Sequence, residues 1–349
     1  MTALLAIWWL SCGLAVTSLI AMGGLIVHRA RRNRREIVEA GRREELKKLA
    51  WELMDRPDRL FLLKSQIKPN DRRLLIQLFS ELLQKIRGKY AERFVSLMRI
   101  LGLMEECLQR LNDRPWWVRA EACTVLGAFN DLNVKLALYR ALEDPIMEVR
   151  VEAARSLVRQ DAVRSVAELV NRLVIGESMP SLAVIDLLRN LSRSAVREFL
   201  ELLDQSPKVG VKLVAIDALG HSGDLDTVPA LLHYYDHPSQ LIRLATMQAL
   251  SLLRDPRALA AVLLAMTDFD WEVRAQAATA AGEIGASEAI PLLEQLLEDE
   301  HWWVRYHAGA ALHNIGELGI LALNEIASRP SPVAAEMAWG ILREKGLAA

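Results

Sequence analysis

The sequence Trp-Trp-Val-Arg occurs twice in this chain, as Trp116-Trp117-Val118-Arg119 and as Trp302-Trp303-Val304-Arg305. The two copies begin 186 residues apart, which is six times 31. At intermediate steps of 31 or 62 residues, a branched apolar residue is again followed by a basic one, at Val149-Arg150, Val211-Lys212, Ile242-Arg243 and Val273-Arg274. A fixed period between about 20 and 50 residues indicates a repeat architecture, in which each unit packs only on its neighbours.

Each period has the signals of two helices joined by a turn. A first helix such as residues 290–297 ends in the acidic turn Glu298-Asp299-Glu300, and a second helix begins near Val304 and stops at Gly316. Other registers place Asp or Pro before the second helix, as in Asp144-Pro145. Asp and Pro favour helix starts and Gly favours helix ends, so the sequence predicts helical hairpins.

The motif of an acidic or Pro turn followed by Val-Arg-x-x-Ala-Ala-x-x-Leu-Gly resembles the HEAT repeat. It is most similar to the short, 31-residue HEAT-like type named after phycobilisome lyases. The resemblance covers residues 112–346, about two thirds of the chain. It implies an all-α fold, a right-handed α-solenoid of HEAT-like hairpins, and a family that includes scaffolds, lyases and hydroxylases.

Residues 3–27 form a run without any charged side chain. At 1.5 Å per residue, a helix of this length reaches roughly 37 Å, enough to cross a hydrocarbon core of about 30 Å. A cleaved signal peptide is the alternative, but no basic residue precedes the run, as such a peptide requires. We therefore predict one transmembrane helix, the anchor at residues 1–28, ahead of the solenoid.

A cluster of arginines follows this run, at Arg29, Arg31, Arg32, Arg34 and Arg35. By the positive-inside rule, the amino terminus faces out and the rest of the chain lies in the cytoplasm. The same arginines are expected to bind the anionic membrane surface. The organisation resembles that of assembly or regulatory subunits of bacterial envelope machinery, which implies a single-pass protein of the bacterial inner membrane.

Charge divides the remainder of the chain into two parts. Residues 28–111 hold 21 Lys and Arg against 12 Asp and Glu, whereas residues 112–349 hold 22 against 32. We predict a basic juxtamembrane helical region and N-terminal cap at 29–111 and a HEAT-repeat array at 112–349. Whether residues 37–111 cap the array or dock on the membrane stays open. An array with a net charge of −10 also argues against nucleic acid as a partner.

Two columns of the repeat contain tryptophan. We predict that Trp116, Trp271 and Trp302 belong to the core. The next column holds Trp117 and Trp303 but also glutamates, so it is predicted to face solvent. Exposed tryptophan is enriched in the hot spots of interfaces. An interface role and an ordinary surface role remain open for these two side chains.

The position after the branched apolar residue is basic in six registers, and we interpret it as structural, with each side chain bridging to the acidic turn of its neighbour. These residues are Arg119, Arg150, Lys212, Arg243, Arg274 and Arg305. Helical spacing also predicts one exposed face of the second helices, which the resemblance implies to be the concave groove that binds a protein. The predicted partner-binding residues are Trp117, Trp303, Glu121, Glu152, Arg155, Asp186, Asp217, Gln248, Gln276 and His307.

Catalytic signals are missing from the sequence. None of the seven histidines is followed by Glu, whereas the iron-dependent hydroxylases built on such repeats use paired His-Glu steps. There is no Cys-x-x-Cys and no glycine-rich phosphate loop. We therefore predict no catalytic residue, cofactor, metal or small-molecule substrate, and a protein that is not an enzyme.

The predicted function is a membrane-anchored cytosolic scaffold that binds a protein partner. The partner is expected to be membrane-associated, and the scaffold would assemble or regulate its complex, for example in envelope polysaccharide synthesis. The alternative is a HEAT-like lyase or a protein that binds a pigment or another small molecule.

Overall fold

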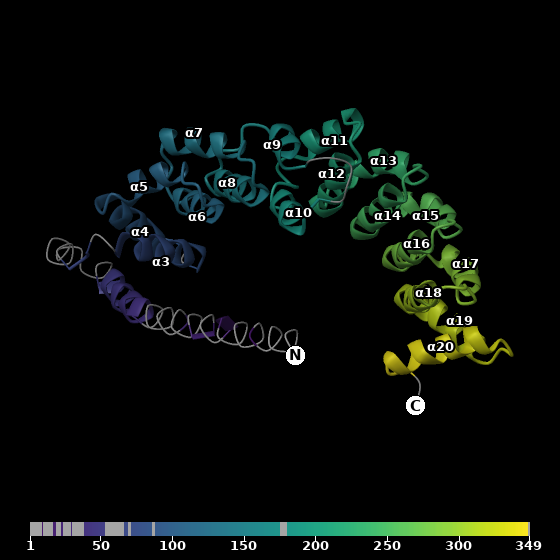
Figure 1. Ribbon diagram of the computed structural model, residues 1–349. Coiled ribbons are helices and arrows are strands. Elements are labelled where there is room, and N and C mark those ends of the chain that lie inside the picture. Colours follow the sequence, from purple (N-terminus) through teal and green to yellow (C-terminus); the bar gives the residue numbers. More distant parts are fainter. Residues whose placement is uncertain are drawn as a thin grey trace. The chain divides into compact units, whose positions relative to one another are not determined.

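A computed structural model describes residues 9, 17–18, 22–23, 29, 38–52, 66–68, 71–85, 88–174 and 180–347. All regular elements in these ranges are helices, which confirms the all-α prediction for them (Figure 1). The predicted anchor, 1–28, lies outside the described residues except for a few isolated positions, and Arg31, Arg32, Arg34 and Arg35 lie outside them too. Within these ranges, no helix combines the length and apolar character that crossing a bilayer requires.

The chain divides into two compact units, residues 1–137 and 138–349. In the first unit, residues 38–52 are helical and four further helices lie before the boundary. These are α3 (Arg72–Lys85), α4 (Lys89–Ile100), α5 (Leu103–Arg110) and α6 (Trp116–Leu126), and α7 (Leu132–Ala141) contains the boundary. The helices α3 and α5 both pack on α6.

The core of the first unit is aromatic. The ring of Phe79 meets that of Phe94 edge to face at 5.2 Å, and Trp51 meets Phe94 in the same way at 6.0 Å. Arg42 joins the helix at 38–52 to the start of α3, because its Nη2 lies 2.6 Å from Oδ2 of Asp71. Such edge-to-face pairs are favoured by the ring quadrupole.

The second unit has two rows of helices, which follow one another along opposite sides of the unit (Figure 1). The even row consists of α8 (Met147–Arg159), α10 (Leu182–Arg189), α12 (Val209–Ser222), α14 (Gln240–Leu253), α16 (Trp271–Ile284), α18 (Trp302–Ile315) and α20 (Pro332–Glu344). The odd row consists of α9 (Val166–Leu173), α11 (Val196–Gln205), α13 (Val228–Leu231), α15 (Leu259–Ala265), α17 (Ile290–Leu296) and α19 (Glu317–Ala327). Short 3-10 turns flank α13, α15 and α17, namely η3 (Leu225–Thr227), η4 (Leu232–Tyr234), η5 (Pro256–Ala258) and η6 (Ser287–Ala289).

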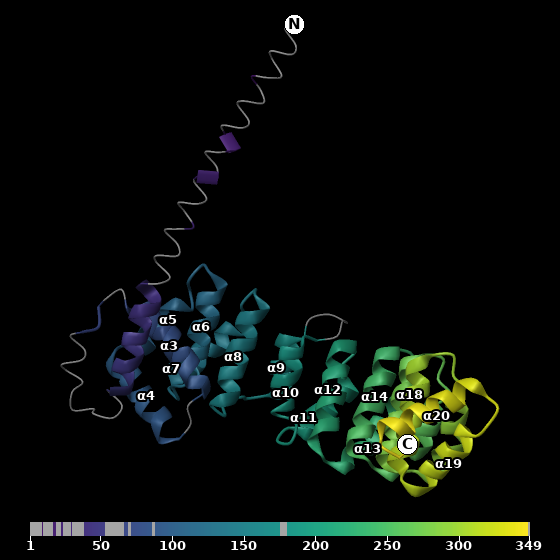
Figure 2. The same ribbon diagram turned by 90° about the horizontal axis from the view of Figure 1, so that it is seen from below.

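The period of the sequence is visible in the even row, where α12, α14, α16 and α18 begin 31 residues apart. Seen after a turn of 90°, the helices of this unit stand roughly alongside one another (Figure 2). The branched apolar column fills the core, since Val211, Ile242, Val273 and Val304 are all 0% exposed. The predicted stack of HEAT-like hairpins is therefore confirmed, and it fits an α-solenoid.

Backbones approach closely within the even row. A Cβ atom placed on Gly220 would lie 2.7 Å from Cα of Ala249, and one on Gly282 would lie 2.7 Å from Cα of Ala311. No real Cβ tolerates that distance from a backbone atom, so each contact requires glycine. Glycine in a helix interior costs stability, which the closer packing of α12 on α14 and of α16 on α18 offsets.

The prediction that Trp116 and Trp302 belong to the core is wrong. Trp116 is 41% exposed and Trp302 is 49% exposed, while Trp271 is intermediate. Both exposed residues are the first residue of their helix. A residue two positions further along a helix points about 200° away, so burial of Val304 turns Trp302 outward. The outward direction of Trp117 and Trp303, which are 57% and 54% exposed, is confirmed.

Candidate functional site

The basic column of the repeat builds a ladder along the even row. Arg274, on α16, donates from Nη1 to the carbonyls of Asp268 and Phe269 in its own turn, at 2.8 and 3.1 Å. Its Nε and Nη2 donate to both carboxylate oxygens of Asp299 in the next turn, at 2.8 and 3.0 Å. The guanidinium therefore holds two successive repeats through a bidentate pair, the strong geometry for this interaction.

Arg243 makes the same contacts one repeat earlier. Its Nε and Nη2 donate to Asp268 at 2.7 and 3.0 Å, and Nη2 also donates to Asp270 at 2.7 Å. The hydrogen bonds from these carboxylates raise the pKa of the Arg243 guanidinium, although burial opposes that change. The predicted bridging by Arg243 and Arg274 is confirmed.

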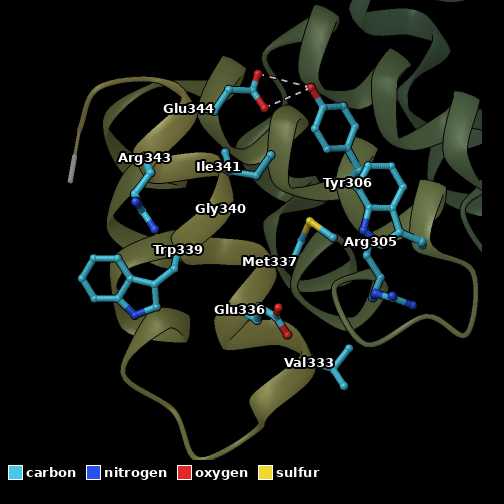
Figure 3. A pocket seen from close by; sticks show the side chains of 11 residues that line it. Arg305, Tyr306, Val333, Glu336, Met337, Trp339, Gly340, Ile341, Arg343 and Glu344 are labelled. Carbon is cyan, nitrogen blue, oxygen red and sulfur yellow. Dashed lines mark hydrogen bonds between the residues drawn. The ribbon is translucent and has the colours of Figure 1, made fainter. Parts of the chain in front are cut away.

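A pocket of about 670 Å³ lies between α18 and α20, at the end of the even row (Figure 3). Apolar walls and four charged side chains line it together. The lining residues are Trp302, Arg305, Tyr306, Val333, Glu336, Met337, Trp339, Gly340, Ile341, Arg343 and Glu344. The volume falls within the range of pockets that hold ligands of drug size.

An aromatic cluster, formed by Trp302, Trp303, Tyr306 and His307, borders this pocket. The rings of Trp302 and Tyr306 stack at 5.3 Å with 14° between their planes, and Trp303 meets Trp302 edge to face at 4.8 Å. Tyr306 Oη donates to the carboxylate of Glu344 at 3.3 Å (Figure 3). These contacts fix the rings of two exposed tryptophans in place, so their apolar surface is available to a partner at little entropic cost.

His307 connects the cluster to the interior. Its Nδ1 lies 3.0 Å from Thr279 Oγ1 on α16, and its ring lies 6.2 Å from that of Trp303. Burial lowers the pKa of the His307 imidazole, which favours the neutral ring near pH 7. A neutral imidazole suits a place beneath stacked aromatic rings, because no charge is then left without solvent.

The other predicted partner-binding residues of the second unit occupy the even row, and ion pairs engage several of them. Asp217 accepts from Arg189 at 2.7 Å, and Glu152 pairs with Arg155 at 2.5 Å. Asp186 lies 3.6 Å from the same Arg189, and Gln248 is exposed. Gln276 is half-buried on α16. Of the predicted set, the structure brings Trp303 and His307 together beside the pocket.

Two of the predicted binding residues lie in the first unit. Trp117 meets Trp116 edge to face at 6.1 Å, so these two rings form a separate exposed pair. Glu121 is half-buried on α6, and burial raises the pKa of its carboxyl. The partner-binding role of all these residues stays a prediction.

Sequence reasoning missed Tyr306, Met337 and the open edge of Arg305. The spacing of Trp302 and Tyr306, four residues apart on one helix, is a signal for a shared face that the repeat pattern hid. The register of Asp299 falls on Pro330 in the last repeat, and this loss of the acidic residue is a second visible signal.

The family described as HEAT repeats matches residues 104–177, 196–268 and 260–338, which together are more than half of the chain. A curated relative, deoxyhypusine hydroxylase of Candida albicans (strain SC5314), is 27% identical over 204 residues. The match covers 56% of this chain and spans 63% of the length of that relative.

Two solved structures are also similar. Human deoxyhypusine hydroxylase, in complex with glycerol, has a TM-score of 0.31 at 21% identity, covering 78% of this chain and 96% of that one. The Escherichia coli protein YibA has a TM-score of 0.38 at 14% identity, covering 81% of this chain and 95% of that one.

The prediction that the chain is not an enzyme is contradicted by these comparisons. The relative from Candida albicans is an enzyme by name, so the chain has an enzyme-family relationship, although a distant one. Histidine patterns had suggested otherwise, because they were searched for one type of metal site and a relationship over 204 residues is a broader signal.

Proposed function

Because the chain belongs to the HEAT-repeat family, we propose that it is a membrane-anchored scaffold that binds a protein partner and assembles or regulates a membrane-associated complex. The observation that carries this proposal is the aromatic cluster beside the pocket between α18 and α20. HEAT-type repeats build extended surfaces, and such surfaces are used for binding.

The composition of the site favours a protein as its ligand. Trp302 and Trp303 are 49% and 54% exposed, and both are stacked or edge-packed on neighbours. Tryptophan and tyrosine dominate the hot spots of interfaces because they bury a large apolar area with few rotatable bonds. Arginines and glutamates surround the rings, as expected for a polar rim.

Support for the membrane anchor comes from the sequence. Residues 3–27 carry no charge, and five arginines follow within residues 29–35. This order of an apolar run and a basic cluster favours a single span with the repeats in the cytoplasm. We propose the inner membrane of a bacterium as the location and the anionic leaflet as the surface that the arginines bind.

A capture experiment tests the scaffold function. The tagged full-length chain is purified from detergent-solubilised membranes, together with a Trp302→Ala, Trp303→Ala variant. As a matched control, Leu264→Ala removes an exposed apolar side chain, 58% exposed, from α15 in the odd row. We expect a stoichiometric protein partner with the wild type and the control, and at least a ten-fold loss with the tryptophan variant. Recovery of the chain alone, or equal recovery with all three, would contradict the proposal.

A second candidate function follows from the relationship to deoxyhypusine hydroxylase. Hydroxylases of this repeat class carry iron on paired His-Glu steps, but no histidine of this chain precedes a glutamate. Among the residues that the structure describes, no group of three or more His, Cys, Asp or Glu side chains could hold a metal ion. The residues present do not fit that iron site.

The activity named for the relative is nevertheless directly testable. The purified chain is incubated with a deoxyhypusine-containing protein, and mass spectrometry follows the addition of one oxygen atom. Product formation would establish the second function for this chain, and its absence beside an active control hydroxylase would remove it.

A further inference from the structure

Arg305 occupies the last basic register of the ladder and keeps only half of the contacts seen in Arg243 and Arg274. Its Nη1 donates to the carbonyls of Asp299 and Glu300 in its own turn, at 2.7 and 3.0 Å. These two bonds reproduce those of Arg274, so the guanidinium is held in the same orientation. Its opposite edge, Nε and Nη2, is the edge that binds aspartate in the two preceding repeats.

The acceptor for that edge is missing in the last repeat. The register that holds Asp268 and then Asp299 continues to Pro330, which has no carboxylate. The Nε–H of Arg305 is buried without a hydrogen-bond partner, and no carboxylate in residues 71–85, 88–174 or 180–347 forms an ion pair with it. A buried donor without an acceptor costs about 1–3 kcal/mol, so a ligand that supplies the acceptor gains that free energy.

An orphaned Nε alone does not define a site, since Arg150 has one too, and the next turn after Arg150 includes residues 175–179, which the structure does not describe. Arg305 differs because it lines the pocket of about 670 Å³. Trp302, Tyr306 and Met337 provide apolar walls there (Figure 3). Glu336 and Glu344 also line the pocket, and Glu344 is engaged by Tyr306 and Lys345.

We propose that this pocket receives an acidic turn of the protein partner, with an Asp or Glu side chain accepting from Nε and Nη2 of Arg305. The proposal rests on the scaffold function and specifies the chemistry of the partner. The chain itself contains the pattern for such a ligand: Asp268 and Asp270 bind Arg243, and the ring of Phe269 lies 4.5 Å from its guanidinium. An aromatic or aliphatic residue beside the carboxylate would contact Trp302 and Tyr306 in the same manner.

A peptide probe taken from that pattern tests the proposal. A fluorescein-labelled peptide with the sequence of residues 267–273, Thr-Asp-Phe-Asp-Trp-Glu-Val, is titrated with the full-length chain in detergent, and fluorescence polarisation reports binding. The control peptide carries asparagine in place of both aspartates. We expect saturable binding of the acidic peptide and at least ten-fold weaker binding of the control peptide.

Variants of the chain assign the binding to Arg305. Arg305→Met removes the donor, and Pro330→Asp supplies the missing carboxylate from within the chain, so both are expected to weaken the acidic peptide at least ten-fold. Glu336→Gln removes a competing carboxylate and should strengthen it. Arg197→Met serves as the control, because Arg197 is a surface residue with a side chain 93% exposed.

Each result either supports or overturns the proposal. Equal binding of both peptides, absence of saturable binding, or undiminished binding to Arg305→Met and Pro330→Asp would overturn it. Circular dichroism of each variant shows whether the helices persist, and Pro330→Asp keeps Arg305 itself intact should Arg305→Met fail to fold. Because these changes leave Trp302 and Trp303 in place, the peptide result and the partner capture can fail independently.

Discussion

Arg274 on α16 grips Asp299 in the following repeat through two parallel hydrogen bonds, with Nε 2.8 Å from Oδ2 and Nη2 3.0 Å from Oδ1. The two side chains are 12% and 9% exposed, so the pair is largely withdrawn from water. A charge that loses its partner in such a place is left buried and uncompensated, and several kcal/mol are at stake.

Replacing Arg274 by methionine is therefore expected to lower the free energy of unfolding by about 3–5 kcal/mol. Urea denaturation of the full-length chain measures the change. The matched control is Arg197→Met, which removes an arginine whose ion pair with Glu201 is exposed, and a change within about 0.5 kcal/mol is expected there. Equal effects of the two substitutions would show that the ladder contributes nothing beyond surface charge.

Two helical glycines of the even row should respond to alanine in opposite directions. At Gly282 a Cβ would lie 2.7 Å from Cα of Ala311, so Gly282→Ala is expected to cost about 1–3 kcal/mol. At Gly340 no atom lies within 4 Å, so Gly340→Ala should stabilise α20 by about 0.5–1 kcal/mol. Thermal unfolding followed by circular dichroism distinguishes them, and the same sign for both would refute the close approach of α16 to α18.

Cys107 is expected to be unreactive in the folded chain. Burial raises the pKa of its thiol to about 12, so almost none is thiolate at pH 8. In a Cys12→Ser, Cys123→Ala variant, Cys107 is the remaining cysteine. Reaction with a thiol-specific reagent should become fast only in urea concentrations that unfold the first unit. Reaction in native buffer at the rate of a free cysteine would contradict this placement.

The pair of Arg42 and Asp71 should make stability depend on pH. The hydrogen bonds from Arg42 hold the pKa of the Asp71 carboxyl below its usual 3.8, so the folded state binds this proton less readily than the unfolded state. The resulting stabilisation is present above pH 3.8 and is lost as pH falls through the lower folded pKa.

An Asp71→Asn variant should accordingly be less stable than the wild type between pH 5 and 7, and the two should converge as pH falls below about 3.8. Urea denaturation at a series of pH values measures the difference. A gap that stays constant down to about pH 2.5 would mean that Asp71 contributes by shape and not by charge.

The repeat architecture could be predicted from the sequence because its signals are periodic. Val273 and Val304 recur at a fixed spacing and are fully buried, and the basic residue after each bridges or caps turns. Trp302 was placed wrongly for the same reason, because a column shared with apolar residues suggests burial although the first turn of a helix leaves its side chain outside. Periodicity shows which residues are equivalent, but the end of a helix changes what equivalence means.

The candidate site could not be predicted, because it arises where the repeat departs from its own pattern. Pro330 replaces an aspartate, and Gly340 on the last even helix meets no further helix. The pocket is the space that these departures leave between α18 and α20. Its residues resemble ordinary repeat positions in sequence, and only their neighbours in space distinguish them.

The glycine contacts of the even row have a consequence for how such an array can change in size. Gly220 meets Ala249 and Gly282 meets Ala311, and each partner of the second pair lies 62 residues after its counterpart in the first. A segment of two repeats, such as residues 240–301, can therefore be duplicated or deleted while every new junction still sets a glycine against an alanine. Gene duplication in steps of this size would lengthen or shorten the reach of the protein without any compensating substitution.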